Sequence, residues 1–193
     1  MKLIKPLVIL FLLTVSSNLW AAKKVRIKPF ILVSNDSGEI SQLIDSTKLK
    51  LTENKFTIVG EYEPTENIHI IATTNDDLLK AAAKTDFGGF GAVIRVAITK
   101  VGDKVQLSYV NPIYMAGLYR MADLKPVADQ LSQALGEGSS FGSKKGIRKK
   151  YLKKYHYMMF MPYFDDQDKI ASFHHMKKHL KPSMTTYLRA KMA

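Results

Sequence analysis

The sequence predicts an α/β protein of the α+β kind: a small, mostly antiparallel sheet with helices on one face, followed by a C-terminal basic strand–helix extension. Three observations support this prediction. Residues 92–110 alternate apolar and polar side chains around a Gly-Asp turn, as β-hairpins do. Strand and helix patterns alternate loosely in the order β-α-β-β-α-β-β-α, which favours an antiparallel or mixed sheet. Positive charge gathers in the last quarter of the chain.

The hairpin has the least ambiguous pattern. In an extended chain, one face of its first strand would carry Val93, Arg95, Ala97 and Thr99, and the other Ile94, Val96 and Ile98. Gly102 can adopt the positive φ that a tight turn between paired strands requires. We therefore expect this hairpin at the centre of the sheet.

Weaker patterns define the elements before the hairpin. The stretch 30–34 reads as a short strand, and Asp36 with Glu39 resembles a capping box that starts a helix. A left-handed residue that ends this helix is expected at Asn54. Further strands are expected over 56–62 and 67–73. Asn75 or Thr74 would then cap a short helix over 76–84.

The sequence after the hairpin contains one further helix pattern. Asn111-Pro112 is expected to end the hairpin, and a last helix to start near Asp123 with Pro126 in its first turn. Its apolar face would consist of Val127, Leu131, Ala134 and Leu135.

Two segments resemble the family named "domain of unknown function 302". They are 54–61 (NKFTIVGE), after the first helix, and 105–112 (VQLSYVNP), at the end of the hairpin. The similarity covers roughly Phe30–Met121. It implies a compact α/β domain, often dimeric, with no established reaction, so a homodimer is one expectation for this chain.

Residues 1–22 have the pattern of a secretory signal peptide. Lys2 and Lys5 form a charged start, 6–15 is apolar, and the segment ends in Ala21-Ala22. The apolar run is about half of the ~20 residues that a spanning helix needs. We therefore expect export with cleavage, to the periplasm in a Gram-negative cell. The chain has no cysteine, which excludes disulfides, zinc–thiolate sites and cysteine nucleophiles.

Charge divides the rest of the chain. From 23 to 142, 14 Lys and Arg balance 14 Asp and Glu, whereas 143–193 holds 13 basic and 3 acidic residues. A glycine- and serine-rich stretch separates the two parts. The expected organisation is a signal peptide (1–22), a neutral α/β domain (23–136), a linker (137–147) and a basic extension rich in Met, His and Tyr (148–193).

The start of the basic part predicts an anion-docking segment. Seven cations lie within eleven residues: Lys144, Lys145, Arg148, Lys149, Lys150, Lys153 and Lys154. They form either a solvated face or a docking site for an anionic membrane surface or an acidic protein. Neighbouring tyrosines would also suit base stacking, but export argues against nucleic acid as the partner.

Histidines and methionines at the C-terminus raise an alternative metal function. Residues 154–164 read as a strand that carries His156 and Met158 on one face, followed by a helix to Leu180. His175 and His179 lie one helical turn apart, the spacing that lets two imidazoles reach one metal. With thioether sulfur they would suit copper(I), or the segment could hold haem; the alternative is a solvated histidine face with methionines in a core.

Catalytic signals are weak. The glycines of 87–91 precede a strand instead of opening a helix, so a turn is favoured over a phosphate cradle. His69 lies in a strand pattern, and Glu61, Glu63 and Glu66 surround a turn. No nucleophile, zinc-protease or nucleotide-binding motif accompanies them.

The sequence therefore favours an exported, non-catalytic binding or accessory protein of unknown ligand whose basic segment docks on an anionic partner. The alternatives are a periplasmic copper or haem handling protein that uses the C-terminal His and Met residues, and an enzyme with a pocket in the α/β domain.

Overall fold

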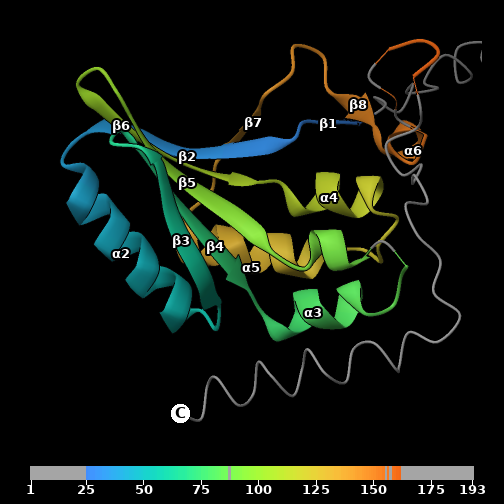
Figure 1. Cartoon of the computed structure of the whole chain (residues 1–193), viewed down its shortest axis with the longest axis horizontal. Coiled ribbons are helices and arrows are strands. Elements are labelled where there is room, and N and C mark those ends of the chain that lie inside the picture. The colour runs from blue at the N-terminus through green and yellow to red at the C-terminus, as the bar shows by residue number, and fades with distance from the viewer. Residues whose placement is uncertain (1–24, 87, 155, 157, 162–193) are drawn as a thin grey trace, which may run out of the picture. The chain divides into compact units, whose positions relative to one another are not determined.

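The computed structural model describes residues 25–86, 88–154, 156 and 158–161 of the 193-residue chain. The chain forms two compact units, residues 1–155 and 156–193. All the helices and strands of the described residues belong to the first unit (Figure 1). The signal-peptide prediction falls on residues outside the described part.

A six-stranded antiparallel sheet forms the frame of the first unit, in the order β3-β4-β5-β6-β2-β7. Its strands are β2 (Phe30–Ser37), β3 (Thr57–Thr65), β4 (Ile68–Thr74), β5 (Ile94–Val101), β6 (Lys104–Val110) and β7 (Ser139–Phe141). The antiparallel α/β fold expected from the sequence is therefore confirmed.

The predicted hairpin is the β5–β6 pair. Val101 pairs with Lys104 around the turn, and Gly102 has a φ of 60°. Ile94, Val96 and Ile98 are fully buried, whereas Arg95 on the opposite side of β5 is exposed. The alternation arises because successive side chains of a strand point to opposite faces.

The helices of the described residues are α2 (Ile40–Glu53), α3 (Asp76–Ala82), α4 (Pro112–Leu118), α5 (Lys125–Leu135) and α6 (Lys149–Leu152). Of these, α2 and α5 pack together and form a layer on one face of the sheet. The predicted face of α5 is buried and belongs to the same core as the inward side chains of β5, and α2 also packs on the sheet (Figure 1). One hydrophobic core thus lies between the sheet and the α2–α5 layer.

Two details of the predicted helix ends are wrong. Asp36 does not cap a helix: β2 continues to Ser37, and α2 begins at Ile40 after Glu39. Pairing of Asp36 with Val105 in the sheet outweighs the local capping signal. The left-handed residue after α2 is Lys55, with φ 64°, not Asn54. Asn75 caps α3 as predicted, by accepting a hydrogen bond from the Leu78 backbone N–H at 2.9 Å.

Asn111-Pro112 ends the hairpin but also starts a helix that the sequence analysis did not predict. The Asn111 carboxamide oxygen accepts a hydrogen bond from the Ile113 N–H at 3.0 Å, and its nitrogen donates to the Lys28 carbonyl at 2.9 Å. Because proline has no backbone N–H, its place at the first position of α4 leaves no N–H unsatisfied there. The Asn-Pro pair therefore joins a helix start to the segment that precedes β2.

The expected linker contains paired strands. β7 pairs with β2 at the sheet edge, and β8 (Ile147–Arg148) pairs with β1 (Arg26–Ile27) in a separate two-stranded sheet. Glycines fit here because the backbone comes close: a Cβ on Gly138 would lie 2.5 Å from the Leu32 carbonyl oxygen. This stretch ties the N-terminal strand to the C-terminal part of the first unit.

The expected strand over 154–164 is wrong for the part that the structure describes. Residues 158–160 form a bend and turn instead, with the Met161 N–H donating to the Met158 carbonyl at 3.1 Å. Phe160 has a φ of 71°, which a regular strand excludes. The expected helix from Asp165 to Leu180 lies outside the described residues.

None of the helices among the described residues has the length and apolar character needed to cross a membrane.

Candidate functional site

The basic segment predicted from the sequence, residues 144–154, starts in a turn and strand that are fixed by contacts to the N-terminus. Arg26 pairs with Arg148 across the β1–β8 sheet, and the Arg26 guanidinium donates to the Gly146 carbonyl at 2.8 Å. The Ser143 hydroxyl accepts from the Gly146 N–H at 3.0 Å. Arg26 thereby joins the basic cluster, although sequence reasoning missed it because it is distant in the chain.

A buried leucine holds the rest of this segment on the domain. Leu152 of α6 is 1% exposed, and it fills the space above Gly117 of α4, where a Cβ would lie 2.6 Å from the Leu152 Cδ1. The close approach of α4 and α6 needs glycine at that position. The basic segment is therefore a fixed part of the first unit and not a detached arm.

The side chains of the segment present a concentrated positive charge. All of its cations are exposed except Arg148, which is half-buried. Lys149 lies 3.6 Å from Asp123, and within the described residues the other six cations form no ion pair with an acid. An excess of unpaired charge attracts anions and is screened by salt.

Tyr151 lies in the middle of this charge. The Arg148 guanidinium lies 4.5 Å and the Lys150 ammonium 4.9 Å from the centre of its ring, and Arg148 also donates to the Tyr151 hydroxyl at 3.0 Å. The ring is 47% exposed. These cation–π contacts order two of the cations around an accessible aromatic side chain.

Two of the predicted metal ligands, His156 and Met158, lie among the described residues. His156 and Met158 belong to the second unit, and Met158 is 60% exposed. His175 and His179 lie outside the described residues. Among the residues that the structure describes, no group of three His, Asp or Glu side chains could hold a metal ion. The copper or haem alternative stays a prediction.

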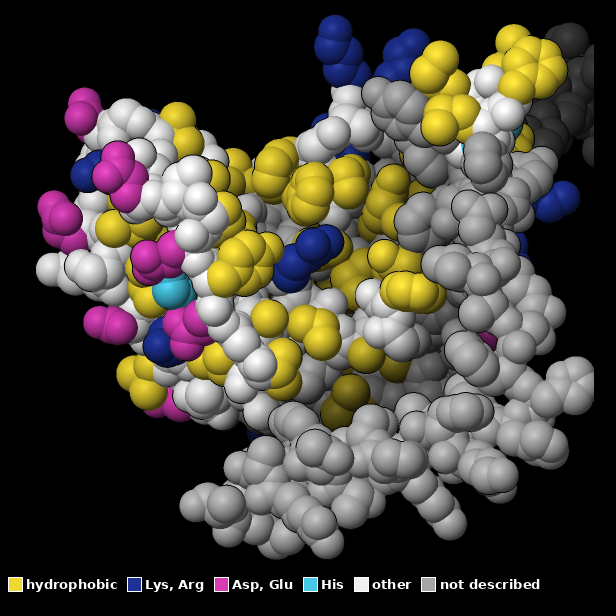
Figure 2. Space-filling view, in the orientation of Figure 1, with side chains coloured by type: hydrophobic (Ala, Val, Ile, Leu, Met, Phe, Trp, Pro, Cys, Tyr) yellow, Lys and Arg dark blue, Asp and Glu magenta, His cyan; other side chains and the backbone are white. Residues whose placement is uncertain are grey.

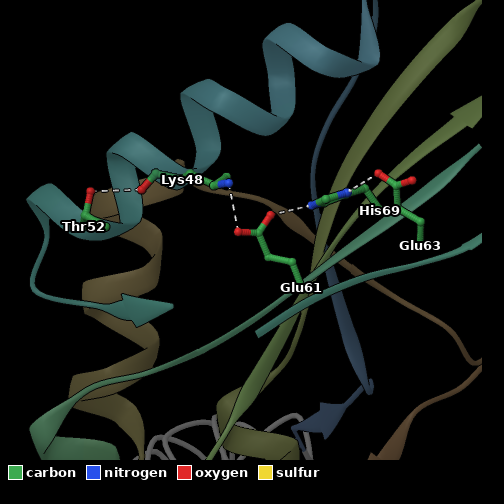
Figure 3. A network of polar contacts seen from close by, with 5 residues as sticks. All are labelled: Lys48, Thr52, Glu61, Glu63 and His69. Atoms are coloured by element: carbon green, nitrogen blue, oxygen red, sulfur yellow. Dashed lines mark hydrogen bonds and ion pairs between the residues drawn. The ribbon is translucent and has the colours of Figure 1, made fainter. Parts of the chain in front are cut away.

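His69 and two of the acids around the β3–β4 turn form a network that the sequence analysis did not predict. The His69 Nδ1 lies 2.9 Å from Glu63 Oε1, and its Nε2 lies 2.9 Å from Glu61 Oε2 (Figure 3). Glu61 also accepts an ion-pair contact of 2.8 Å from Lys48 of α2. Ionised carboxylates only accept hydrogen bonds. Both contacts are therefore hydrogen bonds when the His69 ring carries a proton on each nitrogen.

The short contacts in this network shift the pKa values of Glu61 and Lys48. The hydrogen bond from Lys48 lowers the pKa of Glu61 below its ordinary value of 4.5, with a smaller contribution from His69, and partial desolvation opposes the shift. The same bond raises the pKa of Lys48 above 10.5. The network therefore joins α2 to β3 and β4.

The glycine-rich turn is structural, as the sequence indicated. Gly88–Gly91 forms a short 3₁₀ turn before β5. A Cβ on Gly88 would lie 1.9 Å from the Ala82 carbonyl oxygen, and one on Gly91 would lie 2.4 Å from the Met121 sulfur. The glycines therefore let the turn pack against the end of α3 and against Met121.

Comparison with known proteins finds similarity to a solved structure. No family model matches the sequence. No curated protein matches it significantly. A solved structure, described as the uncharacterized conserved protein DUF302 from Bacillus stearothermophilus, is similar with a TM-score of 0.47 and 10% identity, over 55% of this chain and 93% of that chain. The description of that structure names the family that residues 54–61 and 105–112 resemble.

Proposed function

We propose that the protein is an exported, non-catalytic binding protein that attaches to an anionic membrane surface through residues 144–154. The observation that carries the proposal is the set of six cations that form no ion pair with the described acids, held by a folded strand and helix. A backbone that is already folded loses little conformational freedom on binding, so more of the electrostatic attraction of its cations remains as affinity.

Charge density supports a surface with many anions as the partner. A Lys or Arg near an anionic lipid surface contributes about 1 kcal/mol, and the effect decays within the Debye length of ~8 Å at physiological salt. Seven cations within eleven residues therefore suffice for reversible docking. Tyr151 favours a lipid surface over an acidic protein, since tyrosine gathers at the boundary between membrane and water.

Sedimentation with vesicles tests this proposal. We expect the mature chain to pellet with phosphatidylcholine vesicles that contain phosphatidylserine, and not with pure phosphatidylcholine. Binding should fall steeply as salt rises. The variant Lys144→Gln/Lys145→Gln/Lys150→Gln/Lys153→Gln should lose most of the binding.

A matched variant controls for total charge. Lys50→Gln/Lys84→Gln/Lys100→Gln/Lys104→Gln removes the same charge from exposed positions of the neutral domain, and it should bind vesicles nearly as well as the parent. Equal losses in the two variants, or binding that salt does not weaken, would contradict docking by this segment. Capture of an acidic protein without binding to the vesicles would point to the other partner class.

A further inference from the structure

The face of the sheet opposite the α2–α5 layer carries a hydrophobic groove with one charged side chain in it. Figure 2 shows a hollowed area of hydrophobic side chains with basic atoms in its midst. Two adjoining cavities of about 440 and 420 Å³ make up the groove, and both are lined by Phe30, Arg95 and Val110. Volumes of this size are typical of small-molecule sites.

Aromatic pairs form walls of the two cavities. The rings of Phe90 and Tyr119 stack with their centres 6.0 Å apart in the first cavity, and those of Phe30 and Phe141 lie 5.5 Å apart beside the second. Phe90 is 68% exposed and Phe30 39%. Large aromatic side chains that stay accessible around a hollow indicate a binding surface.

Arg95 is the sole charged side chain among the described residues that line either cavity. It makes no hydrogen bond or ion pair with the part of the chain that the structure describes. It points from the same face of β5 as Val93 and Ala97, so it stands among apolar neighbours. An unpaired guanidinium beside an apolar surface favours a ligand that has both an anionic group and an apolar part, because each part then finds a matching contact.

We propose that this groove binds a single-chain amphiphile with a carboxylate head group, such as a medium-chain fatty acid. The guanidinium of Arg95 presents a planar pair of donors that matches a carboxylate, and one cation calls for one negative charge. The apolar chain lies along the walls of one or both cavities. This ligand site is separate from the basic segment, which contributes no residue to the cavity walls.

Isothermal titration of the full mature chain with decanoate, below its micelle concentration, tests the inference. Decanoate is expected to bind at least about tenfold more tightly than decyltrimethylammonium, which has the same chain and the opposite charge, and acetate is expected to give no measurable binding. Arg95→Met should weaken decanoate binding about tenfold or more and remove the preference for the anion. Lys100→Met, on the same strand but outside both cavities, should change neither.

A second variant tests the groove without removing the charge. Ala97→Phe adds bulk to the wall of the second cavity beside Arg95, and it should weaken decanoate binding even though the guanidinium remains. Thermal unfolding of each variant checks that the domain is folded. Arg95→Met should bind anionic vesicles like the parent, so that the failure of one proposal is distinguished from the failure of the other.

Three results would overturn the inference. Equal affinity for decanoate and decyltrimethylammonium would show that the charge of Arg95 selects nothing. Unchanged decanoate binding in Arg95→Met would place the anion elsewhere. A chain that is dimeric by light scattering, binds no decanoate and becomes monomeric in Ala97→Phe would show that a second copy covers this face.

Discussion

At the scale of single residues, Glu61 has a role that no neighbour in the sequence reveals. Its carboxylate accepts from Lys48 of α2 at 2.8 Å and contacts His69 of β4 at 2.9 Å. One side chain of β3 thus joins a helix to the adjacent strand (Figure 3). These contacts depend on the negative charge of the Glu61 carboxylate, so their contribution to stability changes with pH.

The replacement Glu61→Gln should show this dependence. Because the pKa of Glu61 is lowered on folding, its charged form stabilises the fold above the ordinary pKa of 4.5, and this stabilisation is lost as pH falls through the lower folded value. We expect the difference in unfolding free energy between parent and Glu61→Gln to be largest near neutral pH and to shrink below about pH 4.5. Urea unfolding between pH 3 and 7 measures it.

Glu66→Gln serves as the control, because Glu66 lies in the same hairpin but forms no ion pair with the described residues. It should be nearly neutral at every pH. A difference for Glu61→Gln that stays constant down to pH 3 would mean that the contact with Lys48 contributes nothing through charge.

At the scale of elements, α6 shows how a short helix is held by one side chain. α6 spans Lys149–Leu152, too short to be stable by its own hydrogen bonds. Leu152 is buried against Gly117 of α4, and β8 immediately before α6 pairs with β1. Packing from two directions therefore fixes the backbone that carries the cations.

Truncation of the anchor should destabilise the domain. Leu152→Ala should lower the free energy of unfolding by about 2–5 kcal/mol, the range for deleting a buried leucine side chain. Leu79→Ala in α3 is the matched control, because Leu79 is 46% exposed, and it should cost well under half as much. Equal effects in chemical denaturation would contradict the packing of α6 on α4.

At the scale of the whole molecule, the basic segment and the groove occupy different places on the first unit. The cations of residues 144–154 extend from β8, α6 and the turns before and after them, whereas the groove around Arg95 lies on a face of the six-stranded sheet. A protein can therefore bind a surface by one region and a small ligand by another. Export would place both functions outside the cytoplasm.

Processing of the N-terminus tests the export part of the proposal. Expressed in a Gram-negative bacterium, the chain should appear in the periplasmic fraction with a mass that corresponds to cleavage near Ala22. A Leu10→Arg variant, with a charge inside the apolar stretch, should remain as a full-length precursor in the cells. An intact N-terminus in the parent, measured by mass spectrometry, would contradict export.

The sequence by itself determined the features that depend on neighbours in the chain. Alternation divided the side chains of β5 between two faces, one of which is buried, and helical spacing predicted the apolar face of α5. The Asn75 cap was readable because its bond spans three residues. It also located the basic segment. In each case the physical cause acts within one turn or one strand, so a short window of sequence contains it.

Only the tertiary structure decided the contacts between distant residues. Pairing in the sheet carried β2 past Asp36, and the meeting of β1 with β8 placed Arg26 beside Arg148. The groove around Arg95 exists because segments near residues 30, 90, 110 and 141 come together on one face. Such sites depend on which strands pair and which faces meet, and these follow from the balance of packing over the whole chain rather than from any local pattern.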